Sequence, residues 1–352
     1  MTFAILVAGR PSAPVAAFLD QLDAELRARG WSRVADVDDA KLVLNAVDPE
    51  HPRPFRRRSR GTYAATIVEA PSNGAEVLTA TYPLLVRSLA NIVLSHAGDA
   101  VRFTTMERGV YDVTGVPLAA AVLDRLLPLA TSRLVIDNEF RENLEPDLWE
   151  GDVHTASIRE AGARIAELGL LPAPFPIEEL LDERDLRHVK RLYGIGGLSY
   201  GNLSERLDAR RFWMSASGVD KSRLEAPGRD ILLVSGYDEA RGCIVLSVPP
   251  GSEPRRVSVD AIEHWLIYQA HPDVGAILHV HAWLDGITTT DFNYPCGTEE
   301  LARSVSAALA AEPDPAHAVI GLRNHGITAT GDSLAEILDR VAPALRVSVP
   351  MA

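Results

Sequence analysis

The stretch of residues 258–281 constrains the fold of this 352-residue chain more than any other part of the sequence. Its apolar spacing predicts an amphipathic helix, a turn around Pro272 and then a buried strand that ends in His279 and His281. Residues i and i+2 of a strand lie on the same face. The two imidazoles are therefore expected to point the same way, within reach of one metal ion.

A third histidine, His325, lies far downstream between two short apolar segments, 318–322 and 327–329, which are predicted to be strands. This position predicts a tight turn at His325. Three histidines and an open fourth position form the ligand set of a catalytic zinc ion, whereas a structural zinc site is closed by four ligands. A His-x-His pair on an apolar strand is by itself more often ordinary packing. Two further residues favour the metal site: His325, and Asp260, which lies one helix length before the strand that carries His279 and His281.

Six short motifs follow one another in the second half of the chain. In chain order they are Gly201-Asn202-Leu203-Ser204, Ser215-Ala216-Ser217-Gly218, Asp260, Tyr268-Gln269-x-x-Pro272-Asp273, His279-x-His281 and Asn324-His325-Gly326. Through these motifs, residues 183–346 resemble the class II aldolase/adducin family, which includes fuculose-phosphate aldolase and ribulose-5-phosphate 4-epimerase. The resemblance implies an α/β/α domain with a mostly antiparallel central sheet and assembly into a homo-oligomer, either a tetramer or a dimer.

The resemblance also implies which residues hold the metal and the substrate. Zn²⁺ would be bound by the three histidines, with Fe²⁺ or Mn²⁺ as alternatives, because neutral imidazoles select weakly between these metals. The substrate anion would be bound by the residues that match the family's phosphate pocket, Asn202, Ser217, Gly218 and Ser258. The family has a second serine where this chain has Val259. The loss of one hydrogen bond to a dianion costs roughly 1.5–3 kcal/mol, which weakens the case for a phosphorylated substrate.

Asp260 matches the family's catalytic acidic residue, which is glutamate in the aldolases and aspartate in the epimerase. The resemblance therefore implies that Asp260 transfers the proton during the reaction. The alternative is a helix N-cap, since Glu263 follows Asp260 at the spacing of a capping box. Glu263 and His264 are expected on the helix surface or in packing.

The resemblance and the histidines predict a metal-dependent lyase of the aldolase type. Such an enzyme stabilises an enediolate of a small hydroxy-carbonyl or sugar-phosphate substrate. Three alternatives stay open: an epimerase or dehydratase using the same chemistry, an iron-dependent oxygenase or decarboxylase of the same fold, and a non-catalytic module like adducin. Retention of all three histidines argues against the last.

The segment after His281, residues 282–296, is shorter than in the best-known family members. In those members the missing piece helps to build the subunit interface and supplies a residue across it. Asp291 and Tyr294 are the polar candidates left in this segment for reaching a neighbouring site. They are equally consistent with ordinary loop residues.

Residues 1–150 are predicted to form a separate α/β sandwich domain of unknown role, and residues 151–352 the aldolase-like catalytic domain. A helix is expected from Tyr82 through Ser95, and the acidic segment 139–152 is expected to be a linker. No G-x-G-x-x-G motif or Walker lysine is present, so nucleotide binding is not favoured. The run Arg53–Arg60 contains five arginines, which could bind a phosphate or carboxylate group or form a solvated loop.

The composition of the chain limits the kinds of partner and the cellular location that we expect. The formal net charge of −13 argues against nucleic acid as the main partner, so a small-molecule substrate is expected. No apolar run approaches the roughly 20 residues that span a membrane. Two cysteines, Cys243 and Cys296, give no disulfide framework and are expected in a strand core and in a loop. The first residues lack the basic region of a signal peptide, and a cytoplasmic enzyme is expected.

Overall fold

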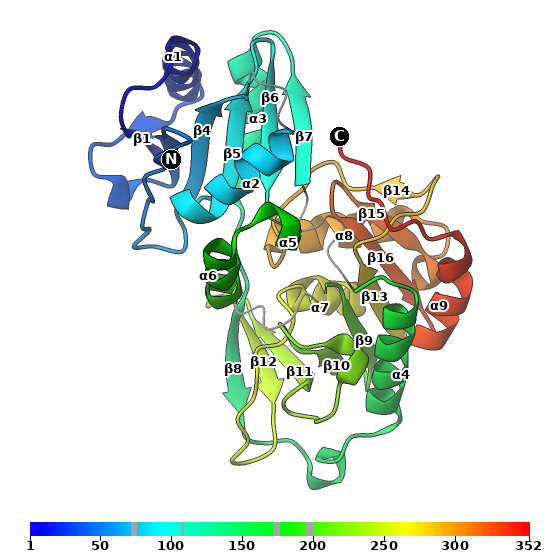
Figure 1. Ribbon diagram of the computed structural model, residues 1–352. Coiled ribbons are helices and arrows are strands. Elements are labelled where there is room, and N and C mark those ends of the chain that lie inside the picture. The colour runs from blue at the N-terminus through cyan, green and yellow to red at the C-terminus, as the bar shows by residue number, and fades with distance from the viewer. Residues whose placement is uncertain (72–75, 107–108, 172–176, 194–199) are drawn as a thin grey trace. The chain divides into compact units, whose positions relative to one another are not determined.

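The computed structural model describes residues 1–71, 76–106, 109–171, 177–193 and 200–352 (Figure 1). The chain is divided into two compact units. The first unit comprises Met1–Ser132, Phe175–Val189 and Met351–Ala352, and the second comprises Arg133–Pro174 and Lys190–Pro350. Each unit contains one β-sheet with helices packed on it, so the chain is of the α/β class.

The first unit is built on a seven-stranded sheet in the order β2-β1-β3-β4-β5-β6-β7. The strands are β1 (Thr2–Val7), β2 (Ser32–Arg33), β3 (Leu42–Ala46), β4 (Tyr63–Glu69), β5 (Ile92–His96), β6 (Ala100–Thr105) and β7 (Gly109–Thr114). Strands β1 to β5 pair in parallel, and β6 and β7 add two antiparallel pairings. Every residue of β3 is buried, as expected for a central strand of a parallel sheet that is covered on both faces.

The helices of the first unit are amphipathic and bury one face. They are α1 (Ala13–Ala28), α2 (Val77–Ser88), α3 (Leu118–Thr131), α5 (Ile177–Leu180) and the part of α6 (Glu183–Tyr193) up to Val189, with the 3₁₀ helix η1 (Val37–Asp39). Helix α1 buries Phe18, Leu22 and Leu26, which recur at helical spacing in the sequence. Arg87 of α2 donates to Asp185 at 2.6 Å, which attaches the segment around α5 and α6 to this unit.

The helix expected from Tyr82 through Ser95 is wrong at both ends. Helix α2 begins earlier, at Val77, and ends before Leu89, whose φ of 57° is left-handed. The following residues Ile92–His96 form β5 instead. They are a largely buried run that begins with three apolar residues, and such a run cannot be distinguished from a buried helix by periodicity alone.

The second unit is built on a nine-stranded sheet in the order β14-β15-β16-β13-β9-β10-β11-β12-β8. The strands are β8 (Asp137–Arg141), β9 (Asn202–Arg206), β10 (Phe212–Ser215), β11 (Ile231–Asp238), β12 (Cys243–Ser247), β13 (Ala276–Val280), β14 (Thr288–Thr289), β15 (Val319–Leu322) and β16 (Gly326–Gly331). The outermost pairings, β8 with β12 and β14 with β15, are parallel, and the pairings between them are antiparallel.

Helices of the second unit pack in two pairs against this sheet. They are α4 (Val153–Glu167), α7 (Ala261–Ala270), α8 (Glu299–Ala311) and α9 (Leu334–Val341), with short 3₁₀ helices η2 (Pro146–Leu148), η3 (Lys221–Arg223), η4 (Pro315–His317) and η5 (Ala342–Ala344). Helix α4 contacts α9, and α7 contacts α8. The helix α7 and the strand β13 confirm the prediction from residues 258–281. Among the described helices, none combines the length and apolar composition needed to cross a bilayer.

The division between the units differs from the boundary expected near residue 150. The second unit begins at Arg133, because β8 pairs with β12 and joins the larger sheet. The segment 139–152 therefore contains part of an edge strand rather than a linker alone. Charged residues are common on edge strands, where they prevent pairing with other chains, and this composition gives β8 the sequence character of a linker.

A buried indole connects the start of α4 to the core of the second unit. Asp152 accepts hydrogen bonds from the backbone N–H groups of His154 and Thr155 and so caps α4. Its other carboxylate oxygen accepts from Nε1 of the fully buried Trp213 at 2.9 Å. The same carboxylate thus satisfies two helix N–H groups and the one polar atom of a core tryptophan.

We predict that Gly326→Ala destabilises the protein by about 1–3 kcal/mol, the usual cost of overpacking. A Cβ at this position would collide with the carbonyl oxygen of Val280 on the neighbouring strand. Gly236→Ala is the matched control, since its Cβ would meet Val245 at an ordinary 3.4 Å. Urea unfolding of both variants measures the difference. Equal stabilities would show that β16 can move away from β13 at little cost.

Candidate metal and active site

The strands β13 and β16 bring the three histidines together. His279 lies in β13 and His281 just beyond its end, while His325 lies in the turn between β15 and β16. Asn324 adopts a left-handed φ of 57° in this turn, a conformation that asparagine tolerates. All three imidazoles are buried, and one ligand atom from each lies within 4.8 Å of the others. The predicted turn at His325 is confirmed.

The hydrogen bonds of these imidazoles suit a metal ligand set. Nδ1 of His279 lies 3.0 Å from the carbonyl oxygen of Ile327, so it donates its proton there. In a neutral imidazole this leaves the lone pair on Nε2 for a metal ion. The Nε2 atoms of His281 and His325 lie 3.0 Å apart. Three converging neutral nitrogen donors in a buried site fit a divalent transition metal.

Asp260 lies at the first turn of α7 and is buried. Its Oδ2 accepts a hydrogen bond of 2.8 Å from Nδ2 of Asn202. Asn202 lies in β9 directly opposite His279 in the strand register. The side chain of Asp260 makes no capping hydrogen bond to α7, so the capping alternative does not describe its contacts. Asn202, predicted in the anion pocket, contacts the predicted catalytic carboxylate.

Lys221 is a buried cation near this carboxylate, and the sequence analysis missed it. It lies in η3, and only 3% of its surface is exposed. Burial lowers the pKa of its ammonium group to about 8, and the negative charge of Asp260 opposes this shift. A buried lysine is rare and is usually paired with an acidic group. The available signal was its position three residues after Gly218 in the anion-binding motif.

Glu263 and His264, expected on the helix surface or in packing, are both buried. Oε1 of Glu263 accepts from the hydroxyl of Thr328 at 2.6 Å. Burial, reinforced by the charge of Asp260, raises the pKa of Glu263 to about 8. Burial also lowers the pKa of His264 well below its usual value. Asp260, Glu263 and His264 therefore all lie inside the protein, so this part of α7 does not face solvent.

The predicted anion-binding residues come from two segments that pair with each other. Ala216 and Val257 form an isolated β-bridge. The backbone N–H of Ser217 donates to the carbonyl oxygen of Arg256 at 2.8 Å. The backbone N–H of Ser258 donates to the carbonyl oxygen of Ser215 at 3.2 Å. Ser217 and Ser258 are therefore brought into one neighbourhood, with the left-handed Gly218 next to Ser217 and Asp260 two residues after Ser258.

The segment 282–296 contributes a thiol near the histidines. Sγ of Cys296 lies 3.4 Å from Nε2 of His325, a contact not anticipated from its expected position in a loop. Asp291 is exposed, and its carbonyl oxygen accepts from Arg323 at 3.4 Å. Tyr294 is partly buried, which raises the pKa of its hydroxyl. That Asp291 and Tyr294 reach a neighbouring subunit stays a prediction.

Comparison with known proteins finds similarity over part of the chain. Among solved structures, L-fuculose 1-phosphate aldolase is similar at 18% identity and a TM-score of 0.38, covering 56% of this chain and 82% of that one. The N-terminal class II aldolase domain of a Thermoplasma acidophilum protein is similar at 13% identity and a TM-score of 0.35, covering 58% of this chain and 95% of that one.

Curated relatives match over a shorter region. A methylthioribulose-1-phosphate dehydratase from Pectobacterium carotovorum is 37% identical over 82 residues, 23% of this chain and 34% of the relative. One from Leptospira biflexa is 33% identical over 107 residues, 30% of this chain and 45% of the relative. The first match thus spans about a third of that relative's length.

The family model described as the Class II Aldolase and Adducin N-terminal domain matches residues 187–284 and 285–344. This region contains the described motifs, the three histidines and Asp260. This match confirms the predicted resemblance of residues 183–346 to the class II aldolase/adducin family.

Proposed function

We propose that this protein is a metal-dependent lyase that acts on a small hydroxy-carbonyl compound or sugar phosphate. The observation that carries the proposal is the convergence of three buried imidazoles in a family domain that also buries Asp260. A purely structural module has no need for such a cluster, because buried polar groups cost free energy unless they are satisfied.

His279, His281 and His325 would hold the metal, with Zn²⁺ as the first candidate and Fe²⁺ or Mn²⁺ as alternatives. When bound, such an ion supplies Lewis-acid chemistry that polarises a carbonyl oxygen and stabilises an adjacent enediolate. The proton on Nδ1 of His279 is held by Ile327, so this imidazole is oriented before any ligand binds.

Asp260 would transfer a proton to or from the carbon or hydroxyl next to the substrate carbonyl. Asn202 donates to Oδ2 of this carboxylate and so fixes its orientation. The ammonium group of Lys221 would keep the carboxylate ionised, since an opposite charge nearby favours the charged form. The hydroxyl groups of Ser217 and Ser258, together with the backbone N–H of Gly218, would bind the anionic end of the substrate, because the backbone N–H groups of the two serines already donate to the carbonyl oxygens of Arg256 and Ser215.

Dehydration is a second candidate reaction at the same centre. The curated relatives that match this chain are methylthioribulose-1-phosphate dehydratases, although the matches cover less than half of their length. Dehydration also begins with proton removal next to a carbonyl, so it would use the same metal ligands and Asp260. A homo-oligomer is expected from the family, and Asp291 and Tyr294 are the residues we would test at its interface.

We predict that the purified protein, reconstituted with Zn²⁺, retains about one metal equivalent per chain, as expected for a single catalytic site. His281→Ala should lose most of it. His317→Ala is the control, because this histidine pairs with Asp314 and Asp332 outside the cluster. Elemental analysis after dialysis gives the metal content. Equal metal retention in the His281 variant would contradict the assigned ligand set.

We predict that Asp260→Asn lowers kcat by about 10²–10⁴-fold, the usual range for losing a general acid or base. The substitution keeps the shape of the side chain, so metal content should stay at the level of the unchanged protein. The assays are cleavage of L-fuculose 1-phosphate and dehydration of methylthioribulose 1-phosphate. Undiminished turnover in the variant would exclude Asp260 as the proton-transfer group.

We predict that kcat/KM falls as the pH rises through about 8. The pKa of Lys221 is lowered to about 8, so its ammonium charge is lost in that range and its support of Asp260 disappears. In Lys221→Met this fall should be absent, with lower activity at neutral pH. Lys41→Met, a change of lysine in the first unit, is the control. If kcat/KM of the Lys221 variant still falls at alkaline pH, the fall is caused by another titrating group.

A further inference from the structure

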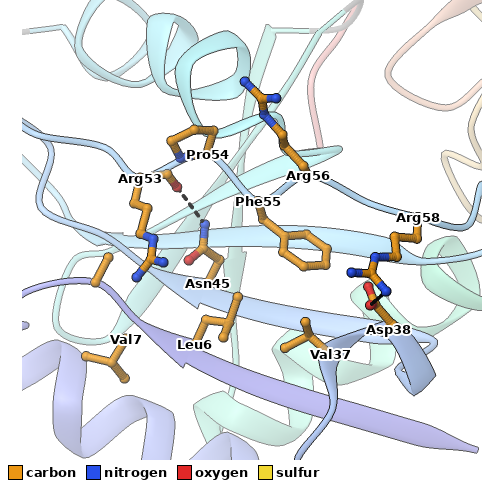
Figure 2. Close-up of a pocket in the computed structure, with 11 residues that line it drawn as sticks. Leu6, Val7, Val37, Asp38, Asn45, Arg53, Pro54, Phe55, Arg56 and Arg58 are labelled. Atoms are coloured by element: carbon orange, nitrogen blue, oxygen red, sulfur yellow. Dashed lines mark hydrogen bonds and ion pairs between the residues drawn. The ribbon is translucent and has the colours of Figure 1, made fainter.

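The first unit contains an open pocket of about 320 Å³ on the β1–β3 part of its sheet (Figure 2). Its floor includes Leu6 and Val7 near the carboxyl end of β1 and Asn45 near the end of the parallel strand β3. Open α/β sheets commonly bind ligands at the carboxyl ends of their strands. In volume the pocket corresponds to about ten water molecules, which suits a metabolite of sugar-phosphate size.

The loop from β3 to β4 forms the wall of this pocket and carries the arginine-rich run. Phe55 of the loop is buried against the sheet and lies above Leu6 and Val37 in Figure 2. The backbone carbonyl of Arg53 accepts from Nδ2 of the buried Asn45 at 3.3 Å. These two contacts hold the loop in place, so the arginines at its surface are presented from a fixed backbone.

Two of the arginines in the run are used by the fold itself. Arg57 donates to Oδ1 of Asn91 at 2.7 Å and to the carbonyl oxygen of Leu89. Arg58 forms an ion pair of 2.9 Å with Asp38 at the pocket rim. Both guanidinium groups therefore have partners within the unit.

Arg53 and Arg56 differ from these two. Both line the pocket and are exposed, and within the described part of the chain neither guanidinium has an ion-pair or hydrogen-bond partner. The chain carries a formal net charge of −13, so acidic side chains are abundant elsewhere. In Figure 2 the guanidinium of Arg53 lies toward Asn45, above Val7, whereas Arg56 extends from the outer side of the loop. Arg56 is exposed and lines the pocket, so it can turn inward without breaking a hydrogen bond or ion pair to the described residues.

We infer that this pocket binds a small phosphate monoester. Guanidinium groups bind phosphate oxygens through paired, charge-assisted hydrogen bonds, and Arg53 with Arg56 offers two such groups. The organic part of the ligand rests on the apolar floor formed by Leu6 and Phe55. The site belongs to the first unit alone and uses none of the histidines or anion-binding residues of the second.

Calorimetric titration of the full-length chain with ribose 5-phosphate tests this inference, with ribose and succinate as companion probes. The metal-site variant His281→Ala serves as the background, so that the measurement does not depend on the proposed lyase activity. The loss of binding in the Arg53 and Arg56 double variant then assigns the binding to the first unit rather than to the anion-binding residues of the second. We expect ribose 5-phosphate to bind and ribose not to bind. The double variant Arg53→Ser/Arg56→Ser should weaken ribose 5-phosphate binding tenfold or more.

The control is Arg27→Ser/Arg187→Ser, which removes the same charge from two exposed helix arginines that form i,i+4 ion pairs. It should leave the affinity within twofold. If both double variants bind ribose 5-phosphate equally weakly, the effect comes from the loss of net positive charge and the proposed site is overturned. An unchanged affinity in Arg53→Ser/Arg56→Ser, or the absence of ribose 5-phosphate binding, would also overturn it. Binding of succinate alone would overturn the assignment to phosphate.

Discussion

The candidate active site depends on the close antiparallel pairing of β13 with β16. Gly326 lies against the carbonyl oxygen of Val280 so tightly that no side chain fits between them. This approach places the turn residue His325 beside His281, and the same ladder supplies the Ile327 carbonyl that orients His279. The positions of the three imidazoles therefore follow from the pairing of two strands. A site held by paired strands is more rigid than a site held by long loops.

A second group of buried charges surrounds Asp260. Asn202 contacts its carboxylate directly and Lys221 supplies an opposite charge, while the pKa of Glu263 on the next turn of the helix is raised to about 8 by burial and by the charge of Asp260. An isolated buried carboxylate would be neutralised, whereas a neighbouring cation favours the ionised form. Perturbed groups of this kind concentrate at functional sites, and here they adjoin a strand that carries a metal-ligand candidate. The arrangement is consistent with proton transfer beside a polarised carbonyl.

Local patterns in the sequence predicted the parts of the fold that depend on local spacing. Residues 258–281 gave the helix, turn and histidine-bearing strand, and the short strands around His325 gave its turn. Long-range packing was not predictable in the same way. Lys221 is buried because η3 packs on α4. The two elements approach so closely that a side chain at Gly162 of α4 would collide with the backbone carbonyl oxygen of Lys221. The charged edge strand β8 was also misassigned, because its partner β12 lies far away in sequence. The strand Ile92–His96 was misassigned because a short buried run has no periodicity that distinguishes a strand from a helix.

Anomalous diffraction from crystals grown with Zn²⁺ tests the central claim most directly. The account predicts one strong anomalous peak about 2.0–2.1 Å from a ring nitrogen of each of His279, His281 and His325, the usual zinc–imidazole distance. Asp260 should lie beside the open coordination position. An anomalous peak bound by other residues would contradict the account. So would the absence of a peak at the three imidazoles in crystals grown with Zn²⁺.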